Sequence, residues 1–87
     1  MKLKDGFVLR EIAGECVVVS ANSELNFNKM ITLNSSAKTL WQALESGIDT
    51  MEGLVVALTS EYDVTQELAE KAAESFISKL KELDFLA

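Results

Sequence analysis

The spacing of the apolar residues changes once along this chain, at residues 34–36, and this change constrains the fold more than any other feature. Before it, apolar and β-branched residues form short runs or alternate with polar residues, which is typical of strands. After it, apolar residues recur at intervals of three and four, which is the spacing of one helix face. Strands that precede helices without interleaving predict an α+β fold.

Three strands are predicted in the first part of the chain. Residues 7–12 and 15–20 are expected to form a β-hairpin, with Ala13 and Gly14 as the turn. The second of these strands contains four consecutive apolar residues, so we expect it at the centre of the sheet. A third strand, with its core at residues 29–33, lies in a stretch of alternating apolar and polar residues. In a simple meander this third strand is an edge.

Three helices are predicted after the strands. Side-chain oxygens at residues 34–36 are available to cap the first helix, which is expected to end near Gly47. Asp49 or Thr50 can cap the second helix, and Thr65 the third and longest. Only residues 62–64 join the second and third helices. A connection this short predicts a helix-turn-helix corner, and beside a small sheet it predicts a winged-helix-like arrangement.

The predicted third helix carries an unusually wide apolar stripe. It is formed by Leu68, Ala69, Ala72, Ala73, Phe76, Ile77, Leu80 and Leu83. At 100° per residue these positions cover about 180° of the helix, where about 100° is enough to pack against a core. Two interpretations remain open: the helix is covered on both sides by the sheet and the other helices, or one margin of the stripe lines a binding groove.

The length and charge of the chain exclude several classes of protein. With 87 residues the chain supports one core, so we expect a single domain over residues 1–87. A formal charge of −6 repels phosphate backbones and anionic lipids. No apolar run approaches the roughly 20 residues that span a bilayer, and the first residues do not resemble a signal peptide. We therefore expect a cytoplasmic protein that binds neither nucleic acid nor membranes.

No catalytic or metal-binding motif is found in the sequence. The chain has no histidine and one cysteine, Cys16, so it lacks the usual general base and the ligands of a structural zinc site. Cys16 begins an apolar run and is interpreted as a small hydrophobic residue of a strand. The carboxylates of Glu67, Glu70 and Glu74 are interpreted as part of a solvated helix face, and Trp41 as a core residue. We expect neither enzyme activity nor a cofactor nor a metal.

The order of several short segments resembles the PqqD-like family. Ile31-Thr32-Leu33-Asn34 leading to Leu40-Trp41 is similar to the family's entry into its first helix. The family's second helix and the corner after it resemble the segment with Thr50, Leu54, Leu58, Tyr62 and Val64. Its closing helix resembles the segment with Phe76, Ile77, Leu80, Phe85 and Leu86. The resemblance covers residues 7–86. It departs at Gly53, where an acidic residue is common, and at Asp84, where glycine often precedes the last apolar pair.

The resemblance implies a non-catalytic, winged-helix-like domain with a three-stranded antiparallel sheet followed by three helices. Such a domain binds the leader segment of a ribosomally made precursor peptide and presents it to a modifying enzyme, often a radical S-adenosylmethionine protein. An edge strand beside an over-wide apolar helix agrees with this role, because it is the geometry for adding a peptide strand to a sheet. The expected peptide-binding residues are Lys29, Met30, Ile31, Thr32 and Leu33 of the strand, and Ala73, Phe76, Ile77, Lys79 and Leu80 of the third helix. A homodimer through the edge strands stays open.

The strongest alternative from another class is a winged-helix transcriptional regulator that places the third helix in the major groove of DNA. Residues 65–84 contain five acidic residues and three lysines, where a protein that contacts phosphates needs a positive face. An enzyme with unrecognised chemistry is disfavoured because the residues for it are missing.

Overall fold

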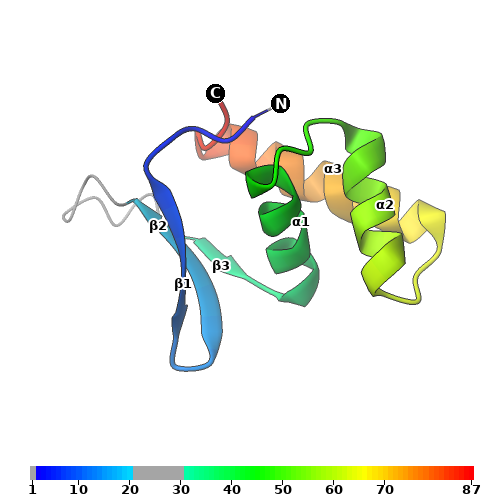
Figure 1. Ribbon diagram of the computed structural model, residues 1–87, viewed down its shortest axis with the longest axis horizontal. Helices are drawn as coiled ribbons and strands as arrows, with labels where there is room; N and C mark the ends of the chain where they lie inside the picture. Colours follow the sequence, from blue (N-terminus) through cyan, green and yellow to red (C-terminus); the bar gives the residue numbers. More distant parts are fainter. Residues whose placement is uncertain (1, 21–30) are drawn as a thin grey trace.

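The computed structural model of the chain describes residues 2–20 and 31–87. Its elements are β1 (Phe7–Ile12), β2 (Glu15–Ser20), β3 (Ile31–Leu33), α1 (Ser35–Glu45), α2 (Met51–Glu61) and α3 (Gln66–Glu82). The strands form one antiparallel sheet in the order β1-β2-β3, and the helices lie to one side of it (Figure 1). The predicted α+β fold, with three antiparallel strands before three helices and the second strand at the centre, is confirmed.

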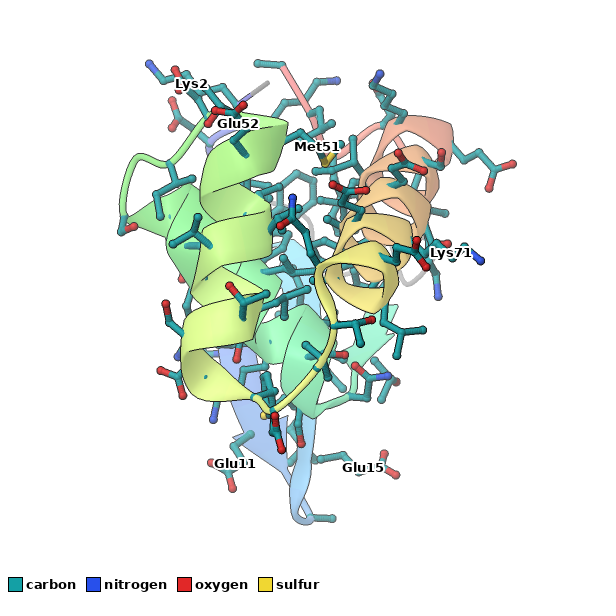
Figure 2. The ribbon with its side chains drawn as sticks, turned by 90° about the vertical axis from the view of Figure 1, so that its right-hand side faces the viewer. Lys2, Glu11, Glu15, Met51, Glu52 and Lys71 are labelled. Atoms are coloured by element: carbon teal, nitrogen blue, oxygen red, sulfur yellow. The ribbon has the colours of Figure 1, made fainter. Side chains whose placement is uncertain are left out.

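The β1–β2 hairpin is set by its two-residue turn. Ala13 and Gly14 both have positive φ, 53° and 83°, which is the conformation of a type I′ turn and matches the twist of the flanking strands. Ile12 pairs with Glu15 directly beside the turn. Seen from the side, the end of the hairpin near Glu11 and Glu15 extends beyond the helices, while α2 and α3 lie next to each other (Figure 2).

Each helix begins at a residue whose side chain accepts a backbone N–H. Asn34 Oδ1 accepts from Ala37 at 2.9 Å, so Asn34 is the cap among the candidates at residues 34–36. Thr65 Oγ1 accepts from Leu68 at 3.2 Å, as the sequence predicts. Of the two candidates for the second helix, the cap is Thr50 and not Asp49. These side chains satisfy donors that have no partner inside the helix.

Helices α1 and α3 end in the same way, with a left-handed residue after the last turn. The positive φ is 108° at Gly47 and 62° at Asp84. In α3 the following residue, Phe85, donates its N–H to the carbonyl of Leu80 at 2.9 Å. This is the Schellman arrangement, which closes the helix and turns the chain back. It directs Phe85 into the core, where its side chain is fully buried.

The core lies between the inner face of the sheet and the three helices. Its largest fully buried side chains are those of Trp41, Phe85, Leu40, Leu54, Leu80 and Val18. The ring of Phe85 stacks on Phe7 with centroids 4.2 Å apart and meets Trp41 edge-on at 6.2 Å. Trp41 is only 1% exposed, so its predicted place in the core is confirmed.

The two ends of the described chain lie side by side (Figure 1). Leu3 pairs with Leu86 as an isolated antiparallel bridge, and the N–H of Lys4 donates to the carbonyl of Phe85 at 3.0 Å. Among the helices that the structure describes, none is long and apolar enough to cross a membrane.

Candidate functional site

The third strand occupies the edge of the sheet. It pairs only with β2, through Cys16 with Leu33, Val17 with Thr32 and Val18 with Ile31. No strand within residues 2–20 and 31–87 covers its other side. An uncovered edge presents backbone donors and acceptors to which another chain can add.

The register assigns Thr32 as the residue whose backbone faces this open edge. Hydrogen-bonded pairs alternate along an antiparallel ladder, and the pair that closes a two-residue turn is a bonded one. Counted from that closing pair, Cys16 and Val18 direct their N–H and C=O groups towards β3. The residues opposite them, Ile31 and Leu33, therefore bond to β2, and Thr32 between them directs its N–H and C=O outwards.

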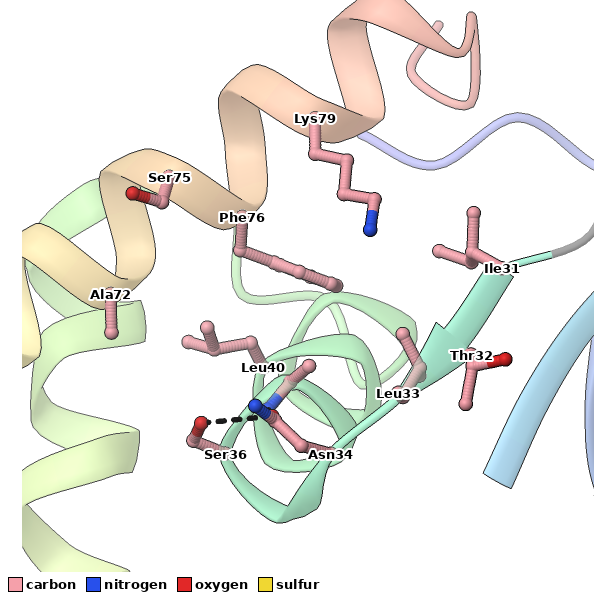
Figure 3. A pocket seen from close by; sticks show the side chains of 11 residues that line it. Ile31, Thr32, Leu33, Asn34, Ser36, Leu40, Ala72, Ser75, Phe76 and Lys79 are labelled. Atoms are coloured by element: carbon pink, nitrogen blue, oxygen red, sulfur yellow. Dashed lines mark hydrogen bonds between the residues drawn. The ribbon is translucent and has the colours of Figure 1, made fainter. Parts of the chain in front are cut away.

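Beside this edge lies a hollow of about 290 Å³, which we call the β3–α3 groove (Figure 3). It is lined by Ile31, Thr32 and Leu33 of β3, by Asn34, Ser36, Ala37 and Leu40 at the start of α1, and by Ala72, Ser75, Phe76 and Lys79 of α3. Ile31, Leu33 and Phe76 are buried parts of its wall that belong to the core. The groove therefore combines an open strand edge with an apolar floor.

Lys79 carries the single charge among the residues that line the groove. Its side chain is exposed, and its ammonium end points into the space between Phe76 and Ile31 (Figure 3). Within the described part of the chain, no carboxylate forms an ion pair with it. This charge stands out in a molecule whose net charge is −6.

Residues 15–86 match the model of the family described as coenzyme PQQ synthesis protein D, PqqD. The chain belongs to the PqqD family. The resemblance noted in the sequence is thus confirmed over residues 15–86, which include β2, β3 and the three helices. No curated protein sequence shows significant similarity to the chain.

Two solved structures resemble this PqqD family member over nearly its whole length. One is TbiB1 in complex with the TbiA(beta) leader peptide, with a TM-score of 0.76, 26% identity, and coverage of 99% of this chain and 94% of that chain. The other is a lasso peptide synthetase B1 complexed with the leader peptide, with a TM-score of 0.71, 24% identity, and coverage of 98% and 93%. Because the identity of this second pair is below 25%, the likeness shows a shared fold and no more.

The structure brings together five of the ten residues expected from the sequence to bind a peptide. Ile31, Thr32, Leu33, Phe76 and Lys79 line the groove of this PqqD family member. Lys29 and Met30 lie outside the described residues.

The remaining three expected residues belong to the core and not to the groove wall. Ala73, Ile77 and Leu80 are 0%, 4% and 0% exposed. Each successive helical residue is rotated by about 100°, so these positions point away from the groove that Phe76 and Lys79 line. Ala73, Ile77 and Leu80 therefore do not line the groove, and their part in peptide binding stays a prediction.

The sequence interpretation missed several residues that line the groove, including Ala72 and Ser75. With Phe76 and Lys79 they stand at i, i+3, i+4 and i+7, so they share one line along α3. This spacing is a sequence signal from which Ala72 and Ser75 could have been placed beside Phe76 and Lys79. The residues at the start of α1 carried no comparable signal, because their place depends on how α1 packs beside α3.

The wide apolar stripe of α3 is buried along its centre and exposed along one margin. The centre of the stripe is buried, whereas Leu68 is 58% exposed and Ala72 is partly exposed. Ala72 lines the groove. The exposed margin therefore reaches the β3–α3 groove at Ala72, and a role of this margin in binding stays a prediction.

The carboxylates and the thiol lie where the sequence placed them. Glu67, Glu70 and Glu74 are exposed on α3, and Cys16 is partly buried in β2 beside the core. In the portion of the chain that the structure describes, no group of His, Cys, Asp or Glu is arranged to hold a metal ion.

Proposed function

We propose that this PqqD family member binds the leader segment of a ribosomally made precursor peptide, which adds as a fourth strand along β3. The observation that carries the proposal is the open edge at Thr32 directly beside the β3–α3 groove. The solved complex of TbiB1 with the TbiA(beta) leader peptide supports it, since that protein is 26% identical over almost the whole chain.

The backbone of the edge supplies affinity that does not depend on the leader sequence. Thr32 offers one N–H and one C=O, and a peptide strand can bond to both at once. Successive side chains of an added strand point to opposite faces of the sheet. Every second leader residue therefore faces α3 and enters the groove, and the others lie on the outer face with the side chain of Thr32.

The side chains of the β3–α3 groove determine which leader sequences bind well. Its apolar floor around Leu33, Leu40 and Phe76 favours an apolar leader side chain, because burial of such a side chain contributes about 1.5–3 kcal/mol. Lys79 at the rim favours an acidic residue nearby, through charge complementarity. We infer that the leader segment on β3 combines an apolar residue with a carboxylate.

The role is that of a binding protein and not of an enzyme, which membership of the PqqD family supports. The second partner we propose is the enzyme that modifies the precursor, with a radical S-adenosylmethionine protein as one class. Binding the leader on β3 holds the precursor while the segment to be modified stays outside the groove. A homodimer through β3 would compete with the leader for the same edge.

Amide hydrogen exchange tests the binding mode. The probe is a synthetic peptide that reproduces the leader of the precursor encoded beside the gene of this chain. We expect the probe to slow exchange at Thr32 and in the adjoining part of β3, because an added strand accepts from that N–H. Slowed exchange confined to the β1–β2 hairpin, or no binding of the probe, would contradict the proposal.

A charge reversal at Lys79 tests whether the α3 side of the β3–α3 groove contacts the leader. Lys79→Glu is expected to weaken binding of the probe about tenfold, on the order of 1.4 kcal/mol, because it removes the complementary charge without removing core volume. Fluorescence anisotropy at two salt concentrations measures this loss, which should shrink at high salt. Lys71→Glu is the matched control, since Lys71 is an exposed lysine of α3 that does not line the groove. Equal losses in both variants would argue against a specific role for Lys79.

A further inference from the structure

A second hollow, of about 450 Å³, lies where α2, α3 and the start of α1 meet, and we call it the corner pocket. It is lined by Asn34, Ser35 and Ser36, by Leu58 and Tyr62 of α2 and its end, and by Val64, Leu68, Ala69 and Ala72 of the corner and α3. None of these residues is charged. In a chain where a quarter of the residues are charged, the pocket is a neutral and mainly apolar surface.

The corner pocket exposes large aliphatic side chains to solvent. Leu68 is 58% and Val64 is 40% exposed, and they are two of the four large hydrophobic residues exposed in the described part of the chain. The hydroxyl of Tyr62, on the same wall, is fixed by a hydrogen bond of 3.1 Å with Thr39 Oγ1. Contiguous exposed apolar surface marks sites that another chain covers, and Val64 and Leu68 lie on the wall of one hollow.

The corner pocket is continuous with the β3–α3 groove. Asn34, Ser36 and Ala72 line both hollows. On α3 the positions of Leu68, Ala72 and Phe76 are four residues apart, so they follow one line from the pocket to the groove. A peptide that leaves the groove at the Leu33 end of β3 therefore enters the corner pocket without crossing a charged surface.

We propose that the corner pocket binds a large apolar side chain from the leader residues that precede the added strand. The inference rests on the proposed function. Antiparallel pairs outnumber parallel ones and are slightly more stable. A leader antiparallel to β3 runs from the Leu33 end to the Ile31 end, so the residues before its strand emerge beside Asn34, at the shared rim of the two hollows.

The lining defines the chemical class of this side chain. Leu58, Val64 and Leu68 provide apolar contacts, and no lining residue provides a counter-charge. A volume of about 450 Å³ admits an aromatic or a long aliphatic side chain, since pockets that hold small ligands begin at about 300 Å³. The corner pocket thus selects an aromatic or large aliphatic residue and rejects a charged one, whose desolvation would be uncompensated.

A second anchor outside the strand also fixes the register of the leader. Backbone bonds to a short edge strand are nearly the same for every register, and a slip by one residue exchanges the two faces of the peptide. An apolar side chain held in the corner pocket determines which leader residue lies opposite Thr32. The side chains that face Phe76 and Lys79 are then determined as well.

Two probes and one substitution test the inference. The longer probe is the synthetic leader described above, and the shorter probe begins at the first leader residue whose amide is protected in the complex. We expect Leu68→Ser to weaken the longer probe about fivefold or more and to leave the shorter probe unchanged, because only the longer one reaches the pocket. Val64→Ser should act in the same direction. Both residues are exposed, so the fold is retained, which the melting temperature checks.

Val56→Ser is the matched control, because Val56 is an exposed valine of α2 that is not in the corner pocket. It should change the affinity of neither probe. If both probes bind and Leu68→Ser weakens them equally, or weakens neither, the corner pocket is not a leader site and the proposed function stands. If neither probe binds, the proposed function itself fails.

Two other occupants would overturn the inference and are distinguished by separate measurements. If a second copy of this chain covers the pocket, sedimentation without peptide will show a dimer that Leu68→Ser dissociates. If the modifying enzyme covers it, Leu68→Ser will slow modification of the precursor while the affinity of the longer probe stays the same. A monomer with reduced affinity for the longer probe alone supports the leader as the occupant.

Discussion

Gly53 lies in the first turn of α2, where glycine is a poor helix former. Its N–H donates to Thr50 Oγ1 at 3.1 Å. A Cβ at this position would lie 2.5 Å from Cγ2 of Ile48 and 3.1 Å from Thr50 Oγ1. The departure from the family pattern at Gly53 therefore has a local cause, since the side chains of Ile48 and Thr50 lie too close for a Cβ at this position.

Gly53→Ala is expected to destabilise the protein. Alanine gains about 1 kcal/mol of helix propensity, but overpacking against Ile48 costs about 1–3 kcal/mol. The net loss of unfolding free energy should be on the order of 1 kcal/mol, measured by urea denaturation. In an Ile48→Ala background the same change should stabilise, because Cγ2 is absent. A higher melting temperature for Gly53→Ala alone would show that Ile48 moves aside freely.

Asp84, the other departure from the family pattern, lies at the end of α3 with a φ of 62°. Aspartate enters this left-handed region more readily than most residues, although less readily than glycine. Its carboxylate forms an ion pair with Lys4 Nζ at 2.7 Å. An exposed pair of this kind contributes about 0–1 kcal/mol. Asp84 thus keeps the helix ending that a glycine would give and adds a contact to the N-terminal segment.

At the scale of the elements, the sequence predicts the parts whose causes are local. The β-hairpin follows from its turn residues, and two of the three helix starts follow from the capping side chains at residues 34–36 and at Thr65. The choice between Asp49 and Thr50 depends on the path of the chain into α2, so the sequence left it open. Likewise, the margin of α3 that stays exposed at Leu68 depends on which elements pack beside it, and no local pattern encodes that.

Proline substitutions at two neighbouring residues of β3 test which backbone groups bind the peptide, and the second serves as the control for the first. Thr32→Pro removes a backbone donor that faces the open edge, so the probe peptide should bind at least tenfold more weakly while the fold is kept. Ile31→Pro removes a donor that faces β2 and a buried side chain, so it should lower the melting temperature by several degrees or unfold the protein. Circular dichroism and anisotropy measure the two effects. Unchanged binding by a folded Thr32→Pro variant would place the peptide elsewhere.

At the scale of the whole molecule, the surface charge separates leader binding from DNA binding, although the α2–α3 corner resembles a helix-turn-helix. The exposed face of α3 carries Glu67, Glu70 and Glu74, which a DNA backbone would repel. The β3–α3 groove, with Lys79 as its one charged lining residue, has an apolar floor beside the open edge of β3. The same helix thus presents a negative face to solvent and an apolar margin to β3.

Duplex DNA is therefore expected to bind no more tightly than about 10⁻⁴ M at physiological salt, the weak end of non-specific binding. The net charge of −6 opposes association at long range, and the acidic face of α3 opposes insertion into a groove at short range. Anisotropy with a labelled random duplex measures this, with the leader probe in the same buffer as the positive control. Lowering the salt should strengthen DNA binding little, because few cationic side chains are available to release counterions. Micromolar and sequence-dependent DNA binding would instead favour a transcriptional regulator, and it would require the Lys79 margin of α3 to face the phosphates.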